Sequence, residues 1–242
     1  MKKVAIVIVH YSGVRNTTQC LQSIEKLQIT NYKLQIIVVD NNPKEQFTVD
    51  NSQLTDTVKI IKSNENLGFS GGNNVGSDEK IGIVVPKIYF AKGYEFHKDR
   101  YKKGELGKVI WYAGGIIDWD NVVGKHRGVD EVDNGQYDQV EPTEFASGCC
   151  FLVKIEVFEK VGFFDEKYFL YYEDADLSMR INKAGHAIMY VPKAILWHKN
   201  AGAAGGSGST LQDYYITRNR LIFGMRYAPL RSKLALIKQS VH

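Results

Sequence analysis

The chain has 242 residues, of which 44% are hydrophobic and 24% charged; this is a globular composition and excludes disordered and fibrous proteins. No apolar run approaches the roughly 18 residues of a membrane-spanning helix, and the N-terminus leads into a strand-like run, so we expect no signal peptide. The net charge of +4 is uneven, because six basic and no acidic residues follow Asp213. This pattern favours a local anionic partner and argues against nucleic-acid binding.

The first half of the chain predicts a strand, a helix and two further strands. The apolar runs Val4–Val9 and Leu34–Val39 are typical of parallel strands buried on both faces, and Val58–Lys62 predicts a third strand. Apolar residues at helical spacing predict a helix over Thr17–Leu27. This order predicts an α/β fold with a single doubly wound, mostly parallel sheet and helices on both faces.

The second half is expected to be richer in loops, with irregular or turn-rich stretches at 98–108 and 118–137. Its predicted ordered elements are a strand over Ile81–Pro86, the segment Phe145–Val153, a helix over Asp174–Ala184, and strands over Ala187–Tyr190 and Ala194–Trp197. The three cysteines, Cys20, Cys149 and Cys150, form neither a disulfide framework nor a Cys-x-x-Cys motif, so they favour a reducing, cytoplasmic setting.

Asp40 closes a predicted buried strand, at the sheet edge where α/β proteins bind ligands. A carboxylate there can accept hydrogen bonds from a ribose or a base, although Asp40-Asn41-Asn42-Pro43 is also good turn chemistry. The glycine- and asparagine-rich stretch Asn66–Asn74 would let backbone N–H groups approach a phosphate, or it is a plain flexible loop. It matches neither Gly-x-Gly-x-x-Gly nor the Walker pattern, which argues against a dehydrogenase or an NTPase.

Three carboxylates, Glu173, Asp174 and Asp176, stand at a predicted helix start, where the helix dipole favours anions. Asp176 is spaced to pair with Arg180 at i, i+4, and one acid could cap the helix, so we predict Asp174 as a general base.

His198 follows an apolar strand-like run and is either a metal or phosphate ligand or a hydrogen-bonded structural residue. Arg218-Asn219-Arg220 could clamp a diphosphate, or it belongs to a solvated helix face.

Taken together and in this order, the motifs resemble glycosyltransferase family 2, especially its rhamnosyltransferase-like branch. The resemblance rests on Ile6–Tyr11 with Cys20–Ser23, Val38–Asn41, Asn66–Asn74, Ala146–Gly148, Val161–Glu166, Tyr172–Leu177 with Arg180, Ala184–Gly185, His198 and Arg218–Arg220. It implies a GT-A fold, a nucleotide-sugar donor, inversion at the anomeric carbon and a divalent cation, Mg²⁺ or Mn²⁺.

The resemblance also implies roles for single residues. Asp174 would be the catalytic base, with Glu173 and Gly148 on the acceptor side and His198 at the metal. The nucleotide sugar would be bound by His10, Tyr11, Asp40, Asn66, Gly68, Gly72, Asn73, Arg218 and Arg220. Residues 1–220 would form the GT-A domain, with a nucleotide-binding half at 1–90 and an acceptor and catalytic half at 91–220, followed by a basic amphipathic tail at 221–242.

The family pattern is interrupted between Gly76 and Ser77. A helix, a strand ending in Asp-x-Asp and a further helix, on the order of 30 residues by typical element lengths, are absent from the sequence at this junction. An omitted segment, a shortened chain and a naturally degenerate member are the alternatives. We favour the omitted segment, because loss of a central strand would expose buried-type runs such as Ile81–Val85.

The resemblance favours an inverting transferase that moves a sugar to a glycan or lipid-linked acceptor in cell-surface polysaccharide synthesis. The alternative is a catalytically degenerate nucleotide- or glycan-binding protein of the same fold. The tail predicts either peripheral contact with the inner face of an anionic membrane or a packed C-terminal helix interrupted at Pro229.

Overall fold

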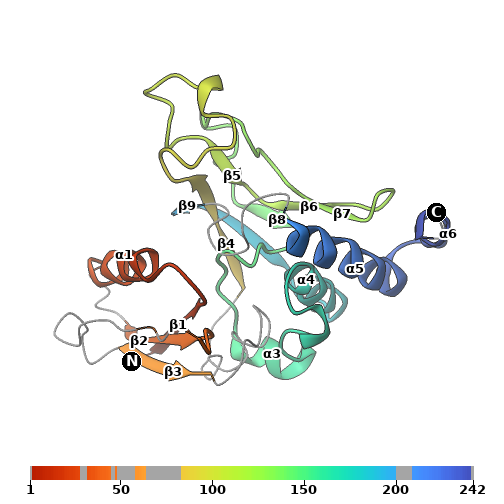
Figure 1. The fold of residues 1–242 in the computed structure, drawn as a ribbon, viewed down its shortest axis with the longest axis horizontal. Helices are drawn as coiled ribbons and strands as arrows, with labels where there is room; N and C mark the ends of the chain where they lie inside the picture. The colour runs from red at the N-terminus through yellow and green to blue at the C-terminus, as the bar shows by residue number, and fades with distance from the viewer. Residues whose placement is uncertain are drawn as a thin grey trace. The chain divides into compact units, whose positions relative to one another are not determined.

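The computed structural model describes residues 2–27, 32–44, 47, 58–63, 83–199 and 209–240 (Figure 1). The chain divides into two compact units, one of residues 1–82 and 154–170 and one of residues 83–153 and 171–242. The predicted α/β class is confirmed, and the longest strand pairs are parallel. The expected single sheet is wrong for the described strands, which form sheets of three, four and two strands.

The first unit is built on a parallel sheet in the order β1 (Lys2–His10), β2 (Tyr32–Asp40) and β3 (Val58–Lys62). Alternate residues of a strand point to opposite faces, and β2 is buried on both, since Ile36 and Val38 are as inaccessible as Ile37 and Val39. This confirms that the continuous apolar run is a central strand. β1 and β2 pair in register down to His10 opposite Asp40, so both residues lie at the carboxyl edge.

Helix α1 (Val14–Glu25) begins three residues earlier than predicted and ends two residues earlier. Gly13 precedes it with φ +77°, a left-handed conformation that suits glycine. The helix packs Leu21 against Ile36, Val38 and Phe47 in the core of this unit. Helix α3 (Ile155–Val161) and the short 3₁₀ helix η3 (Glu166–Tyr168) belong to the same unit.

The second unit contains a four-stranded sheet in the order β5 (Ile110–Tyr112), β4 (Val84–Phe90), β9 (Ile188–His198) and β8 (Glu141–Thr143). The two strands predicted between residues 187 and 197 are one strand, β9, which runs parallel to β4. The pairing register of β4 with β9 shifts at one point, because Pro86 pairs with Val191 whereas the next residue, Lys87, pairs with Ile195. The intervening residues include Pro192, which has no N–H for the ladder, so a bulge at this point is expected.

Two further strands, β6 (Gly115–Asp118) and β7 (Val123–His126), form an antiparallel hairpin. β7 lies in the stretch 118–137, which was predicted to be rich in turns. The short 3₁₀ helix η2 (Lys98–Arg100) lies in the polar stretch before β5.

Buried charge stabilises this unit at Lys87, which is 2% exposed on β4. Its ammonium group lies 2.8 Å from Asp133 and 2.5 Å from Asp138, and Tyr89 also donates to Asp133. Burial by itself would lower the pKa of Lys87, but the hydrogen bonds to the two carboxylates outweigh it and raise the pKa. The sequence alone gave no reason to place a lysine in the core.

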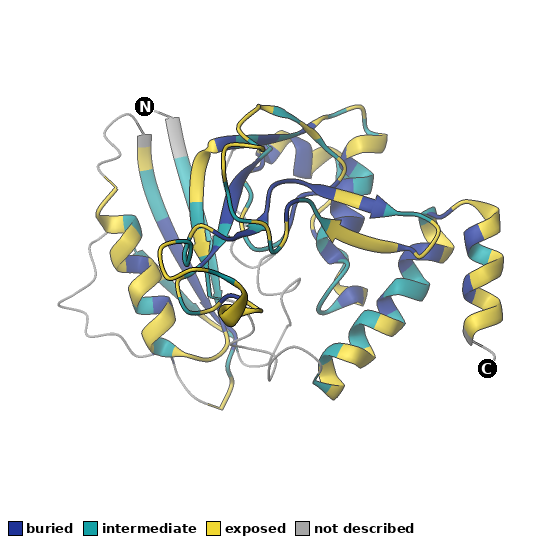
Figure 2. Ribbon diagram, turned by 90° about the horizontal axis from the view of Figure 1, so that it is seen from above, coloured by how far each residue is buried: buried dark blue, intermediate teal, exposed yellow. Residues whose placement is uncertain are grey.

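Three helices, α4 (Glu173–Lys183), α5 (Thr210–Tyr227) and α6 (Leu230–Ser240), complete the second unit. The predicted boundary between the domain and its tail, at residue 220, lies inside α5. The helix ends at Tyr227, and Ala228 and Pro229 separate it from α6. α6 exposes most of its surface (Figure 2), but Leu236 is buried against α5. A Cβ on Gly224 would lie 2.2 Å from Leu236 Cδ1, so glycine permits this close approach. The three cysteines are free thiols.

Candidate functional site

Asp174 lies in the first turn of α4, where its carboxylate accepts two backbone hydrogen bonds. Gly148 N–H donates to Oδ2 at 2.7 Å, and Ala175 N–H donates to Oδ1 at 2.8 Å. Ser178 Oγ donates to the Asp174 carbonyl and accepts from Ala146 N–H, which fixes the segment 146–148 against α4. Each carboxylate oxygen has two lone pairs, so each can accept one further hydrogen bond.

Glu173 stands beside Asp174 in a different environment. Its side chain is buried, with 5% of the residue exposed, and Oε2 has no hydrogen-bond partner within the part of the chain that the structure describes. Burial and the neighbouring Asp174 charge raise the pKa of Glu173 well above its ordinary value. Burial also raises the pKa of Asp174, but the backbone N–H groups act in the opposite direction. The pKa of Glu173 is raised the more of the two, because within the described structure only Asp174 accepts hydrogen bonds from the N–H groups of other residues.

The residues before α4 have an unusual backbone conformation, since Tyr171 and Tyr172 both have φ +69°. Such conformations are strained for residues other than glycine and persist only when the surroundings impose them. Buried Asn219 of α5 donates to the Tyr171 carbonyl at 2.8 Å, and the Tyr172 hydroxyl donates to the Val122 carbonyl at 2.9 Å. These contacts hold the turn that presents Glu173 and Asp174.

Asp176 has a structural position, as its spacing to Arg180 predicted. Its fully buried carboxylate accepts from Arg180 Nε at 2.8 Å. From α5, Arg226 Nη1 donates at 2.6 Å and the Tyr227 hydroxyl at 2.7 Å. Asp176 thus joins α4 to α5, which lie side by side in Figure 1.

Arg218 and Arg220 are both on α5 but two residues apart, which separates their directions by about 200° around the helix. Arg218 donates to Asn219 Oδ1 at 2.7 Å, whereas Arg220 donates to the Asn121 carbonyl at 2.7 Å and to Gln239 of α6. The structure does not bring the two guanidinium groups together as one clamp. Arg220 lies close enough to Tyr172 to oppose the effect of burial, which raises the pKa of that hydroxyl to about 12.

His198 ends β9 and lies among aromatic rings. Its ring centroid is 4.6 Å from that of Trp111, which is also 4.3 Å from the ring of His126. Burial lowers the pKa of both histidines, that of His126 to about 4, so both rings are neutral at pH 7. A neutral imidazole can bind a metal, but no group of three or more metal-binding side chains occurs in the described ranges. These residues alone do not fit a metal site.

In the first unit, His10 and Asp40 come together as their strand positions predict. His10 is buried, with Nδ1 2.8 Å from Thr17 Oγ1 and its ring 4.5 Å from that of Phe47. Asp40 accepts from Phe47 N–H at 2.8 Å and from Asn42 N–H at 3.3 Å. Its carboxylate therefore organises the turn, which is the alternative the sequence left open. Tyr11 follows β1 and is exposed, and its carbonyl accepts from Asn42 Nδ2 at 2.7 Å.

The remaining predicted nucleotide ligands, Asn66, Gly68, Gly72 and Asn73, lie outside the described residues, as does the Gly76–Ser77 junction. Asn219, which holds the Tyr171 carbonyl, was not among the residues predicted from the sequence to position the site. A signal was present, because a polar residue four positions before Phe223 shares its helix face, and both are buried.

No protein-family model matches the sequence. Two curated relatives from strains of Mycobacterium tuberculosis, each named N-acetylglucosaminyl-diphospho-decaprenol L-rhamnosyltransferase, are 44% identical over 72 residues, or 28% of this chain. The match spans 24%, about a quarter, of the length of these relatives. The low-salt glycan biosynthesis hexosyltransferase Agl10 of Haloferax volcanii is 22% identical over 235 residues, covering 90% of this chain and 74% of that protein.

Among solved structures, the mannosyltransferase PcManGT from Pyrobaculum calidifontis, in complex with GDP-Man and Mn²⁺, is 14% identical with a TM-score of 0.49. The match covers 98% of this chain and 69% of that one. The curated relatives are named as sugar transferases. This confirms that the sequence is similar to glycosyltransferases, as its motifs indicated.

Proposed function

We propose that this chain is an inverting glycosyltransferase in which Asp174 is the general base. The observation that carries the proposal is the Asp174 carboxylate, held by two backbone N–H groups beside a buried Glu173 whose Oε2 has no hydrogen-bond partner in the described structure. The names of the curated relatives support a sugar as the transferred group. The donor would be a nucleotide sugar and the acceptor a glycan or lipid-linked sugar.

The chemistry requires a base because an acceptor hydroxyl is a weak nucleophile until its proton is removed. In the proposed step, the acceptor oxygen bonds to the anomeric carbon and its proton passes to Asp174. The bond from the anomeric carbon to the diphosphate oxygen breaks, and that oxygen keeps the electron pair. Attack opposite the leaving group inverts the configuration.

Asp174 suits this role better than Glu173. The two N–H donors stabilise its anionic form, whereas buried Glu173 holds its proton more tightly. The place of Glu173 on the acceptor side stays a prediction from the resemblance. Gly148 would act by fixing the base.

The test is a panel of nucleotide sugars given to the purified protein with and without Mn²⁺ or Mg²⁺, with release of nucleoside diphosphate as the readout. Asp174→Asn should lower turnover on the order of a thousandfold and leave donor binding, measured by calorimetry, within about twofold. Asp213→Asn, the same change at an exposed site on α5, is the matched control. Retained turnover in Asp174→Asn would remove the residue from this role.

A second candidate is a nucleotide- or glycan-binding protein without catalysis. It is favoured by the absence from the sequence, at the Gly76–Ser77 junction, of a strand that ends in Asp-x-Asp, and by the lack of a metal-binding cluster in the described ranges. The same panel separates the two, since this candidate binds a donor but turns over none, with or without the cation. A divalent cation stays a prediction from the resemblance.

Membrane contact through 221–242 also stays a prediction. On α6, Leu230, Leu234 and Ile237 are exposed, and Arg231 and Lys238 flank them. None of the helices that the structure describes has the length and apolar character needed to cross a bilayer. Co-sedimentation with anionic vesicles that weakens as salt rises would support surface contact, and binding insensitive to both salt and lipid charge would contradict it.

A further inference from the structure

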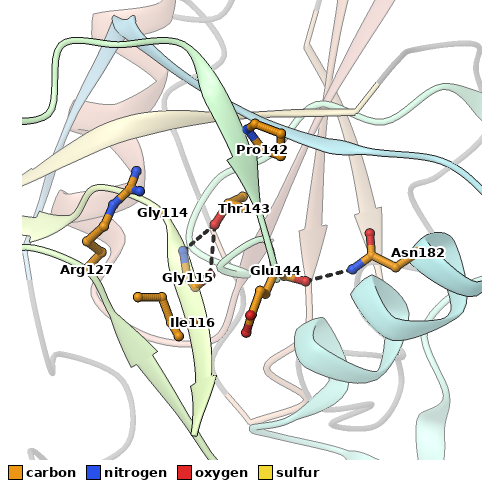
Figure 3. A pocket seen from close by; sticks show the side chains of 8 residues that line it. All are labelled: Gly114, Gly115, Ile116, Arg127, Pro142, Thr143, Glu144 and Asn182. Atoms are coloured by element: carbon orange, nitrogen blue, oxygen red, sulfur yellow. Dashed lines mark hydrogen bonds between the residues drawn. The ribbon is translucent and has the colours of Figure 1, made fainter.

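A cavity of about 430 Å³ lies in the second unit, away from the Asp174 carboxylate. Its walls come from the start of β6, the end of β8 and the last turn of α4 (Figure 3). This volume is within the range of small-molecule sites. None of its lining residues was predicted as functional from the sequence.

Gly115 and the Thr143 hydroxyl group form one wall of the cavity. Thr143 Oγ1 accepts from Gly115 N–H at 2.6 Å and donates to the Gly115 carbonyl at 2.9 Å, as Figure 3 shows. A Cβ on Gly115 would lie 2.4 Å from the Phe145 ring, and one on Gly114, where φ is +103°, would lie 3.0 Å from Arg127 Nη2. Only glycine allows these approaches, so the wall is rigid and closely packed.

Besides Thr143, three of the residues that line the cavity have polar side chains. Glu144 uses Oε2 to accept from Ile117 N–H at 2.6 Å, and Oε1 has no hydrogen-bond donor among the described residues. Asn182 donates through Nδ2 to the Glu144 carbonyl at 2.9 Å, and within the described ranges its Oδ1 is likewise open. Arg127 is held by the Ala113 carbonyl at 2.7 Å and lies between the rings of Tyr137 and Tyr190.

The charges select the kind of ligand. Arg127 forms an ion pair with Glu141 at 2.6 Å, so Glu144 leaves the cavity with excess negative charge, which disfavours a phosphate or carboxylate. No metal-binding cluster occurs there or elsewhere in the described part of the chain. The open carboxylate and amide oxygens instead match a neutral ligand whose hydroxyl groups donate hydrogen bonds.

The cavity is related to the proposed base through α4. Asn182 follows Asp174 by eight residues, about 12 Å along the helix axis, and Glu144 precedes Gly148 by four. We propose that this cavity is a second saccharide subsite, which binds a neutral sugar residue of the acceptor remote from the transferred sugar. The assignment to the acceptor rests on the proposed function.

The test uses no donor, so it is independent of catalysis. Methyl glycosides and disaccharides of rhamnose, mannose, glucose and N-acetylglucosamine are titrated into ¹⁵N-labelled protein, with inorganic phosphate as the anionic comparison. At least one saccharide should shift the backbone signals of Gly114 and Gly115 and the Asn182 side-chain amide, with a dissociation constant on the order of 1 mM. Asn182→Ala should weaken binding about fivefold and Glu144→Gln about tenfold.

Asn134→Ala is the matched control, because Asn134 is also exposed and also donates from Nδ2 to a backbone carbonyl, that of Val132. It should bind like the wild type. The proposed subsite would be refuted if no saccharide shifts these NMR signals or if all variants bind saccharide equally. It would also be refuted if only phosphate shifts the signals. Saccharide binding without any nucleotide-sugar turnover would instead refute the proposed function and leave the saccharide site itself supported.

Discussion

Asp176→Asn tests whether α5 is held to α4 by one buried carboxylate. Asp176 is 0% exposed, while the side chains of its partners Arg180 and Arg226 are 22% and 37% exposed. Asparagine has the same shape but no charge, and it replaces one oxygen by an NH₂ group that cannot accept. The orientation that keeps the Arg226 and Tyr227 bonds sets this NH₂ against Arg180 Nε.

The magnitude follows from these contacts. A hydrogen bond to a charged group contributes about 1.5–3 kcal/mol, and the substitution removes the bond from Arg180 and weakens the bonds from Arg226 and Tyr227. Water reaches both arginines and recovers part of this loss, so we expect the free energy of unfolding to fall by about 2–3 kcal/mol. For a chain of this size, the urea midpoint should fall by about 1 M.

Tryptophan fluorescence suits the assay, because all three tryptophans, Trp111, Trp119 and Trp197, lie in the second unit. Trp119 stacks on Phe223 of α5, with ring centroids 5.8 Å apart, so the signal reports on the region that Asp176 joins. Asp213→Asn is the control and should change stability by less than about 1 kcal/mol. A loss for Asp176→Asn below about 0.5 kcal/mol, the range of surface substitutions, would refute the reasoning.

Three further predictions concern the site and the cavity. In the wild type the urea midpoint should fall as pH rises through the range in which Glu173 titrates, and in Glu173→Gln this fall should be absent. A carboxyl whose folded pKa is raised contributes stability below its unfolded pKa and loses it, at about 1.4 kcal/mol per pH unit, as pH rises to the folded pKa; an equal slope in both proteins would contradict this. Gly115→Ala should cost about 2–3 kcal/mol in urea unfolding because its Cβ meets Phe145, whereas Gly104→Ala, with nothing within 4 Å, should be near neutral; equal costs would exclude the packing explanation. Asn219→Ala should cost about 2 kcal/mol and lower turnover, since it frees the Tyr171 carbonyl; unchanged turnover would show that the turn holds without it.

The sequence alone determined the local elements and the contacts that follow from spacing. The apolar run of β2 reflects burial on both faces, whereas the similar run Val4–Val9 forms β1, which is only half-buried at the edge of the described sheet. The Asp176–Arg180 pair followed from helix geometry, and Asp40 at the end of β2 followed from parallel strand order. These features depend on neighbours a few residues away.

Only the tertiary structure shows that the two adjacent carboxylates have different environments. Asp174 receives a hydrogen bond from Gly148, 26 residues earlier, and Glu173 is buried without a partner for Oε2 in the described structure. Tertiary structure also decided the burial of Lys87, whose charge Asp133 and Asp138 compensate. It likewise brought together Glu144 and Asn182, which are 38 residues apart in the chain. Burial and hydrogen-bond partners depend on residues far apart in the chain, so no local pattern encodes them.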